Sequence, residues 1–371
     1  MILENIELRN FRLHKNNSIK FSDKLNYIVG GNGHGKTTVL EAIYYLSTTK
    51  GFGQTGDSEA ISFGENFFEL KGKFISLTNN QVRVFFDAVE RRKKYFLNDK
   101  QIFKPSEIIG KFPVVILSLA DHEITMGTPA NRRKFVDSII SQASGTYLKM
   151  LLEYKRTLKY RASILQQIRE NKSNKSLAEL DAWTETLIKL GAEIILHRQS
   201  FVSEFEKYVE TAYKKIMDEV EIPRINYVTF STEFNKQNIF VKLQKSFEER
   251  RDLEIARGTN LIGPHRDDFE FYLNEKLLKK FGSQGQHKTF QIALRFAQFY
   301  YIKDKSGETP IFLMDDIFGE LDSYRSEKIR DYLDKVGQAF ITMTDFTRFE
   351  KFQKNESDKL ILIENGKVAN A

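Results

Sequence analysis

The chain has 371 residues, enough for two or three domains, and its 41% hydrophobic content can form sizeable cores. It contains no cysteine, which excludes disulfides, thiolate catalysis and cysteine-ligated metal sites. Lysine and arginine number 57 against 50 aspartates and glutamates, a net charge of +7 that permits a polyanionic partner without requiring one. No apolar run approaches the ~20 residues that span a bilayer, and no signal peptide is evident. We therefore expect a cytoplasmic protein with no membrane partner.

The first 50 residues predict strands followed by a helix. Leu3 to Asn10 alternates between apolar and polar residues, which indicates a strand, whereas His14 to Ser18 is polar and predicts a turn. Leu25 to Val29 predicts a short apolar strand. After a glycine-rich turn, apolar residues recur at helical spacing from Thr37 to Leu46 and predict an amphipathic helix.

The middle of the chain changes from strands to helices. Residues 61–103 alternate and predict antiparallel strands, and Phe112 to Leu119 predicts a strand buried on both faces. Apolar residues then fall three or four apart from Asn131 to Glu170 and from Trp183 to Met217. These stripes predict two long antiparallel helices, an arm of roughly 50 Å at 1.5 Å per residue.

Strand and helix alternation resumes after about residue 256 and continues to the end. We therefore expect one α/β domain made from residues 1–122 and 257–371. A helical arm domain, residues 123–256, is inserted between them.

The glycine-rich turn fits the pattern G-x-x-x-x-G-K-[ST]. Its glycines let backbone N–H groups surround phosphate oxygens, Lys36 supplies charge at the β- and γ-phosphates, and the Thr37 hydroxyl can bind Mg²⁺. The positive end of the following helix faces the same anion. The pattern predicts an ATP site formed by Gly30, Gly31, Asn32, Gly33, His34, Gly35, Lys36, Thr37 and Thr38.

An apolar strand from Pro310 to Met314 ends in two aspartates. A carboxylate at the end of a buried parallel strand can hold Mg²⁺, and we assign this role to Asp315 together with Thr37. Asp316 is predicted to polarise the attacking water, so Asp316 and Lys36 are the candidate catalytic residues. An acidic pair that merely begins a turn is the weaker interpretation beside a P-loop.

Gly282-Ser283-Gln284-Gly285-Gln286 opens a predicted helix and resembles the signature motif of ABC ATPases. That motif contacts the γ-phosphate held by the opposite subunit, so the resemblance assigns Ser283 and Gln286 to the ATP site of a partner subunit and implies a homodimer. The same residues would also form an ordinary helix N-cap. The order of P-loop, signature and Asp-Asp strand favours the ABC interpretation, and Gly319-Glu320-Leu321-Asp322 resembles the D-loop.

Motifs across nearly the whole chain resemble one family, the RecF recombination mediators. They occur in family order: Asn10-Phe11-Arg12, the P-loop, Pro113-Val114-Val115, Asn131 to Asp137, Tyr154 to Arg161, Gly263 to Asp268, Gly282 to Gln286, and Asp315 to Asp322. The resemblance implies an α/β ABC-type P-loop ATPase head with an inserted α-helical hairpin arm. It also implies a weak, DNA-stimulated ATPase of repair, replication and the SOS response. Such a protein dimerises on DNA with ATP and Mg²⁺ and helps RecO and RecR load recombinase at single-strand gaps.

The sequence departs from this family at several positions. Residues 50–56 lack the usual arginine, Leu119-Ala120-Asp121 replaces Pro-Glu-Asp, Lys288 replaces an arginine, and Gly319 replaces a serine. Thr342-Met343-Thr344 stands where ABC transporters carry a histidine, which argues against a transporter ATPase subunit. Another genome-maintenance ATPase and a nucleotide-gated scaffold with slow hydrolysis remain as alternatives.

Three basic clusters could contact DNA phosphates: Arg91 to Lys94, Arg132 to Lys134, and Lys155-Arg156 with Lys159 and Arg161. For any single cluster a solvated charged surface is the simpler interpretation, so DNA binding rests chiefly on the resemblance. His265-Arg266-Asp267-Asp268 is expected to form a tight turn rather than to serve the nucleotide.

Overall fold

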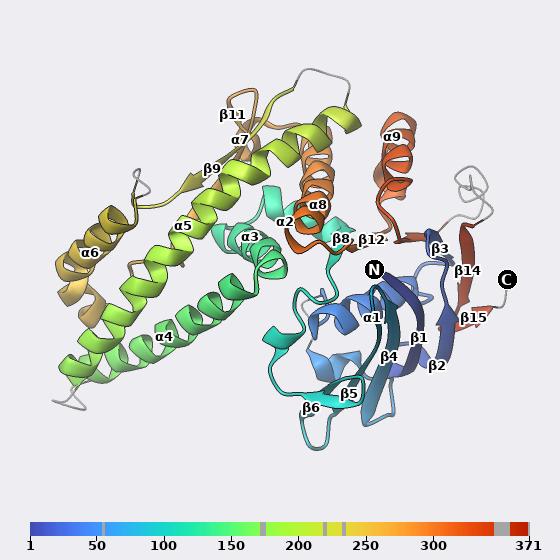
Figure 1. The fold of residues 1–371 in the computed structure, drawn as a ribbon, viewed down its shortest axis with the longest axis horizontal. Coiled ribbons are helices and arrows are strands. Elements are labelled where there is room, and N and C mark those ends of the chain that lie inside the picture. Colours follow the sequence, from blue (N-terminus) through green and yellow to red (C-terminus); the bar gives the residue numbers. More distant parts are fainter. Residues whose placement is uncertain (54–55, 171–175, 218–220, 232–234, 345–356, 370–371) are drawn as a thin grey trace. The chain divides into compact units, whose positions relative to one another are not determined.

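The computed structural model describes residues 1–53, 56–170, 176–217, 221–231, 235–344 and 357–369. The chain forms two compact units, drawn in Figure 1. The first unit comprises residues 1–121, 211–219 and 292–371, and the second comprises residues 122–210 and 220–291. Among the described helices, none is long and apolar enough to cross a membrane.

The first unit contains a mostly parallel sheet of six strands in the order β15-β14-β3-β13-β12-β8. Strands β3 and β13 are buried at every residue, as expected inside a parallel sheet. Only β15 runs antiparallel, against β14. The bounds are β3 Leu25–Val29, β8 Val114–Ser118, β12 Ile311–Asp315, β13 Ala339–Met343, β14 Lys359–Glu364 and β15 Lys367–Ala369.

A second, antiparallel sheet in the same unit has the order β2-β1-β4-β5-β6-β7. The predicted turn over His14 to Ser18 is wrong, because these residues form β2 and pair with β1 from Phe11↔His14 to Asn5↔Lys20. Their polarity reflects an edge strand whose side chains mostly face solvent. The bounds are β1 Ile2–Phe11, β2 His14–Lys20, β4 Phe67–Ile75, β5 Asn79–Asp87, β6 Arg92–Leu97 and β7 Lys100–Ile102.

Helix α1 (Lys36–Thr48) contacts strands of both sheets. Val39, Leu40, Ile43 and Leu46 are fully buried, and one hydrophobic core joins them to both sheets. The unit also contains α9 and the second half of α8. The remaining bounds are α8 Gln284–Ser306, α9 Ser323–Leu333, and the short 3₁₀ turns η1 Asp57–Ala60, η2 Pro105–Glu107, η3 Leu119–Asp121 and η4 Phe318–Glu320.

The second unit is mainly helical, and α4 (Gly145–Arg169) and α5 (Ser176–Ile216) form the predicted hairpin (Figure 1). The last residues of α5, from Thr211, belong to the first unit. Ile164 and Leu165 of α4 pack against Leu180 of α5 near the tip. The predicted helix from Asn131 is divided at Ser144, whose hydroxyl accepts from the Tyr147 amide and caps α4. The other helices are α2 His122–Thr125, α3 Pro129–Ala143, α6 Lys236–Arg257 and α7 Leu278–Phe281.

This unit extends beyond the boundary expected near residue 257. Strand β10 (Asp268–Leu273) pairs with β9 (Pro223–Val228) on one side and β11 (Lys276–Leu277) on the other. Buried Arg198 of α5 donates to Asp137 at 3.0 Å and to the Pro264 carbonyl at 2.7 Å. Residues 257–291 are therefore held by the helical unit, because their ladder and ion-pair partners lie there.

Candidate nucleotide site

The P-loop connects β3 to α1, as the motif requires. Gly33 (φ 76°) and Gly35 (φ 100°) take left-handed backbone conformations that side chains disfavour. A Cβ atom on Gly30 would approach the Ile363 carbonyl oxygen to 2.2 Å. Gly366 donates its amide to the His34 carbonyl at 2.9 Å. The loop is therefore fixed by the β14–β15 hairpin as well as by its own glycines.

A buried histidine from β2 supports the same loop. His14 Nε2 lies 3.0 Å from the Gly35 carbonyl oxygen, and the Asn17 amide lies 2.8 Å from His14 Nδ1. Burial lowers the pKa of His14 and so favours the neutral ring. Because a carbonyl oxygen faces Nε2 and an amide N–H faces Nδ1, the neutral ring donates from Nε2 and accepts at Nδ1. No sequence motif pointed to His14, because the contact exists only once β2 lies beside the loop.

Lys36 is 7% exposed and begins α1. Its ammonium donates to the carbonyls of Gly30 and Gly31 at 2.9 and 2.8 Å. Burial lowers its pKa, while Asp316 and Asp315 oppose this shift. The ammonium thus lies at the centre of the loop, close to both aspartates at the end of β12.

The end of β12 meets α1 through a hydrogen bond between residues far apart in sequence. Thr37 Oγ1 donates to Asp315 Oδ1 at 2.8 Å, and Thr342 Oγ1 of β13 donates to the same oxygen at 2.9 Å. Thr342 Oγ1 also accepts from the Asp316 amide at 2.9 Å. Asp316 has φ 52°, a conformation that is uncommon for a residue with a side chain. The structure therefore gathers Lys36, Thr37, Asp315 and Asp316, and adds Thr342.

These residues fit the chemistry of a nucleotide and its metal. Mg²⁺ prefers oxygen ligands and is usually held by one or two carboxylates together with substrate phosphates. Thr37 supplies a hydroxyl oxygen and Asp315 supplies a carboxylate oxygen, and these two oxygens lie 2.8 Å apart. The other predicted loop residues, Asn32 and Gly33, are exposed, whereas Thr38 is buried within α1.

The signature segment lies in the second unit and starts α8. The Ser283 amide donates to Gln286 Oε1 at 2.8 Å, and the Gln286 amide donates to Ser283 Oγ at 3.2 Å. This reciprocal pair is a capping box, so both residues have a local structural role. Ser283 remains exposed at the positive end of the helix.

Two motif residues outside these segments are held in ion pairs. Arg12 makes a bidentate pair with Glu41 of α1, at 2.7 and 2.9 Å. Asp121, the acidic residue of the divergent 119–121 segment, accepts from Arg295 of α8 at 2.8 Å. Residues 50–53 and 56 are described, whereas 54–55 of that divergent loop lie outside the described residues.

The basic clusters divide into structural and exposed groups. Lys93 bonds Asp57 at 2.8 Å and the Thr49 carbonyl at 3.0 Å, and Arg132 makes a bidentate pair with Asp268. Buried Arg161 bonds Glu254, Asn260 and Thr184. In the third cluster, Lys155, Arg156 and Lys159 are exposed on α4.

The tight turn expected over residues 265–268 lies earlier, at Gly263–Arg266, and Asp268 already begins β10. The Arg266 amide donates to the Gly263 carbonyl at 2.9 Å. His265 Nδ1 lies 2.8 Å from the Tyr154 hydroxyl, and burial lowers the pKa of His265 to about 4. These contacts tie the turn to α4 within the second unit.

Residues 2–367 match the family described as the RecF/RecN/SMC N terminal domain. A Chloroherpeton thalassium protein named DNA replication and repair protein RecF is 40% identical over 363 residues, 96% of this chain and 98% of that protein. A Salinibacter ruber protein of the same name is 35% identical over 356 residues, 94% of this chain and 86% of that protein. The chain belongs to the RecF family. RecF proteins are ABC-type ATPases of DNA replication and repair, and the chain shares this general assignment.

Solved RecF structures confirm the predicted fold class. One, described as RecF-ATP in the RecFOR pathway, is 29% identical, covers 99% of this chain and 97% of its own, and has a TM-score of 0.90. Its RecF-ATPrS counterpart has the same identity and coverage, with a TM-score of 0.88. A Pyrococcus furiosus Smc head domain, 18% identical over 99% of this chain and 96% of its own, has a TM-score of 0.56 and shares the fold.

Proposed function

We propose that the chain binds ATP and Mg²⁺, closes as a homodimer on DNA, and helps RecO- and RecR-type proteins load recombinase at single-strand gaps. Slow, DNA-stimulated hydrolysis then resets the dimer. The observation that carries the nucleotide part is the Thr37–Asp315 hydrogen bond, which joins the P-loop to the end of β12. The DNA and partner parts are supported by the family, whose solved members are described as recombination mediators of a RecFOR pathway.

Each proposed role follows from the position of a side chain. Lys36 and the P-loop amides would hold the phosphates, and Thr37 with Asp315 would hold Mg²⁺. When bound, the metal supplies charge stabilisation to the phosphoryl group. Asp316 would orient the attacking water, because the Thr342 hydroxyl anchors its amide. Ser283 and the N-terminus of α8 would contact the γ-phosphate of ATP held by the partner subunit.

The test is ATP hydrolysis by the purified protein over a concentration series, with and without gapped duplex DNA. A site completed by a second subunit predicts that activity rises more steeply than protein concentration and that gapped DNA increases it. Turnover that is linear in protein and indifferent to DNA would overturn the dimer and DNA parts while leaving the P-loop assignment. Asp316→Asn should retain ATP binding and lose hydrolysis in the same assay.

A further inference from the structure

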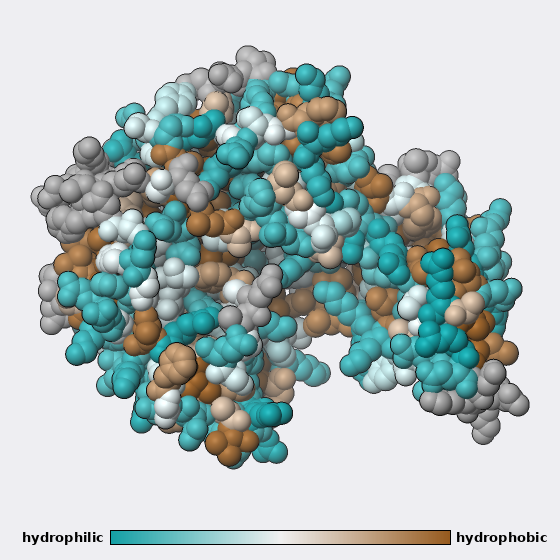
Figure 2. Space-filling model, turned by 180° about the vertical axis from the view of Figure 1, so that it is seen from behind, coloured by the Kyte–Doolittle hydropathy of each residue, from teal (hydrophilic) through white to brown (hydrophobic). Residues whose placement is uncertain are grey.

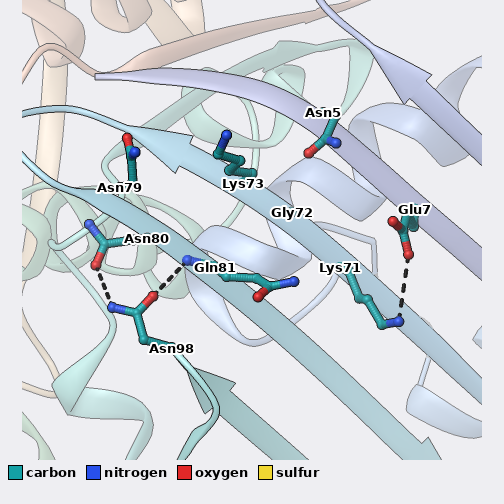
Figure 3. A pocket seen from close by; sticks show the side chains of 9 residues that line it. All are labelled: Asn5, Glu7, Lys71, Gly72, Lys73, Asn79, Asn80, Gln81 and Asn98. Carbon is teal, nitrogen blue, oxygen red and sulfur yellow. Dashed lines mark hydrogen bonds and ion pairs between the residues drawn. The ribbon is translucent and has the colours of Figure 1, made fainter.

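Many charged side chains of this protein pair with one another at the surface. Hydrophilic residues cover much of the face in Figure 2, and the hollow in Figure 3 contains such a pair, in which Lys71 lies 3.6 Å from Glu7. Exposed ion pairs of this kind contribute little to stability. Glu221 of the second unit differs from these carboxylates, because Gln286 Nε2 of the signature segment donates to its Oε1 at 2.6 Å.

The carboxamide of Gln286 is held at both of its polar atoms. Its Oε1 accepts from the Ser283 amide at 2.8 Å, and its Nε2 donates to Glu221. An exchange of the oxygen and the nitrogen would place donor against donor at Ser283 and acceptor against acceptor at Glu221. The two contacts therefore fix the orientation of the carboxamide, and Glu221 supports the capping box from outside the helix.

The three-stranded sheet of the second unit fixes the backbone beside Glu221. The Ile222 amide donates to Asn274 Oδ1 at 2.8 Å, and the Asn274 amide donates to the Ile222 carbonyl at 3.1 Å. These two bonds continue the pairing of β9 with β10 beyond the ends of the strands. Glu221 is thus the next residue along the chain from an anchored strand end.

The same sheet leads into the signature segment. Strand β11 is followed by α7, where the Leu278 carbonyl accepts from the Gly282 amide at 2.8 Å. A Cβ atom on Gly282 would lie 2.7 Å from that carbonyl oxygen, so a side chain at this position would displace α7. One sheet therefore places both partners of the hydrogen bond between Glu221 and Gln286.

This arrangement leaves the polar groups that suit a phosphate facing outward. Ser283 Oγ accepts from the Gln286 amide at 3.2 Å, which keeps the hydroxyl hydrogen for another acceptor. Ser283 is exposed at the positive end of α8. Without Glu221 the Gln286 carboxamide can rotate and bond the Ser283 hydroxyl itself. The donors would then have to be reorganised whenever a phosphate arrives, which weakens their effect on the reaction.

We propose that Glu221 is a positioning residue of the signature segment. It orients Gln286, so that Ser283 and the first-turn amides of α8 are ready for the nucleotide of the partner subunit. Glu221 touches no phosphate itself and affects only the ATP bound across the dimer. The inference rests on the proposed function, because it requires a site shared between subunits, and it adds a residue that lies outside the sequence motifs.

The first test compares Glu221→Ala with Glu221→Gln, which keeps an acceptor oxygen for Gln286. Hydrolysis at saturating ATP should fall about tenfold in the alanine variant, less than the roughly 100-fold cost of removing a stabilising donor itself. The glutamine variant should stay near the wild-type rate. Binding of a fluorescent ATP analogue at low protein concentration should be unchanged in both variants, because the P-loop of the same subunit is intact.

Two controls separate positioning from a loss of charge or of structure. Glu275→Ala removes an exposed carboxylate from the turn between β10 and β11 and should keep the wild-type rate. In a Gln286→Ala background, adding Glu221→Ala should cause no further loss of hydrolysis, because Glu221 acts only through Gln286. A general structural defect would instead lower the rate of the double variant again, whatever the melting temperature of the single variants.

A mixing experiment assigns the defect to one half of the shared site. Heteromers of Glu221→Ala and Lys36→Ala combine the P-loop of the first subunit with the intact signature segment of the second. An equal mixture should therefore reach about a quarter of wild-type hydrolysis. Mixed with Ser283→Arg, Glu221→Ala should give no more hydrolysis than it gives alone, because neither signature segment of the heteromer is intact.

Several outcomes would overturn the inference. They are an alanine variant that is as fast as wild type or faster, an equal loss in Glu221→Gln, a further loss in the double variant, and recovery with Ser283→Arg in place of Lys36→Ala. The mixture of Lys36→Ala with Ser283→Arg distinguishes these failures from failure of the proposed function. Recovery in that mixture keeps the shared site and leaves only the role of Glu221 in question, whereas no recovery removes both.

Discussion

Two hydroxyl groups act on the pKa of Asp315 at the end of β12. Burial raises the pKa of Asp315, while hydrogen bonds from Thr37 and Thr342 act to lower it. Metal binding requires the ionised carboxylate, so the site should lose activity as pH falls through this raised pKa. The Thr342 hydroxyl is therefore expected to shift the acid limit of hydrolysis to lower pH, because it acts to lower the pKa of Asp315.

Thr342→Val removes one of the two hydroxyl donors to Asp315 and should raise its pKa further. The acid limb of the kcat–pH profile then moves to higher pH. Thr342→Ser keeps the hydroxyl and is the control, with a limb near the wild-type position. If the acid limb of the valine variant coincides with that of the serine variant, the Thr342 hydroxyl does not affect the pKa of Asp315.

Motifs in the sequence predict part of the candidate site, whereas residues that reach it from neighbouring strands are not predicted. Lys36, Thr37, Asp315 and Asp316 were predicted from local patterns. Thr342 was noted only as a substitute for a transporter histidine. His14 lay in a predicted turn, and neither contact is visible before β2 and β13 take their places in the sheets.

Among the elements of the second unit, α4 and α6 are joined by a buried ion pair. Arg161 and Glu254 are 1% and 0% exposed, and their side chains meet at 2.6 Å. The second Glu254 oxygen accepts from the Leu261 amide at 2.6 Å. Each charge is therefore compensated inside the unit, which makes removal of only one partner costly.

Arg161→Met should lower the free energy of unfolding by about 3–5 kcal/mol, because it leaves Glu254 buried and charged without its partner. Adding Glu254→Gln removes that charge, keeps an acceptor for Leu261, and should recover most of the loss. Urea denaturation followed by circular dichroism measures both variants. A single variant as stable as wild type would show that the pair contributes little.

Elements with a strong apolar pattern were predicted closely, and polar ones were not. The predicted strand Leu25–Val29 has the same first and last residues as β3. The two hairpin helices were predicted from apolar residues spaced three or four apart. Helix α6 was not singled out, because few of its residues are buried: Ile239, Leu243, Phe247 and Glu254. The edge strand β2 was mistaken for a turn for the same reason.

For the whole molecule, a shared site predicts complementation between two inactive variants. Lys36→Ala should lose phosphate binding in its own subunit, and Ser283→Arg should block the site of its partner. When the two variants are mixed in equal amounts, half of the dimers should be heteromers, and each heteromer has one intact site of two. About a quarter of wild-type hydrolysis should therefore return. The absence of any recovery would contradict a site shared between subunits.

The proposed DNA contact of the helical unit makes a separate prediction. Neutralising the exposed cations Lys155, Arg156 and Lys159 to glutamine should reduce the salt slope of duplex binding by up to about 2.7, at about 0.9 per phosphate contact. A triple variant of Lys104, Lys111 and Lys367 removes the same charge from the first unit and serves as the control. An unchanged slope in the α4 variant would place the duplex surface elsewhere.

The order in which the parallel sheet is assembled constrains biosynthesis. Strand β3, which leads into the P-loop, lies between β13 and β14, and about 330 residues separate Val29 from Lys359. At 5–20 residues per second, roughly 15 to 65 seconds pass between synthesis of β3 and of its last neighbour. During translation the second unit is synthesised in full before β13 and β14. Until then the apolar strand β3 has neither of the two strands with which it pairs. A ribosome-bound chaperone that covers β3 in this interval should therefore raise the yield of folded protein.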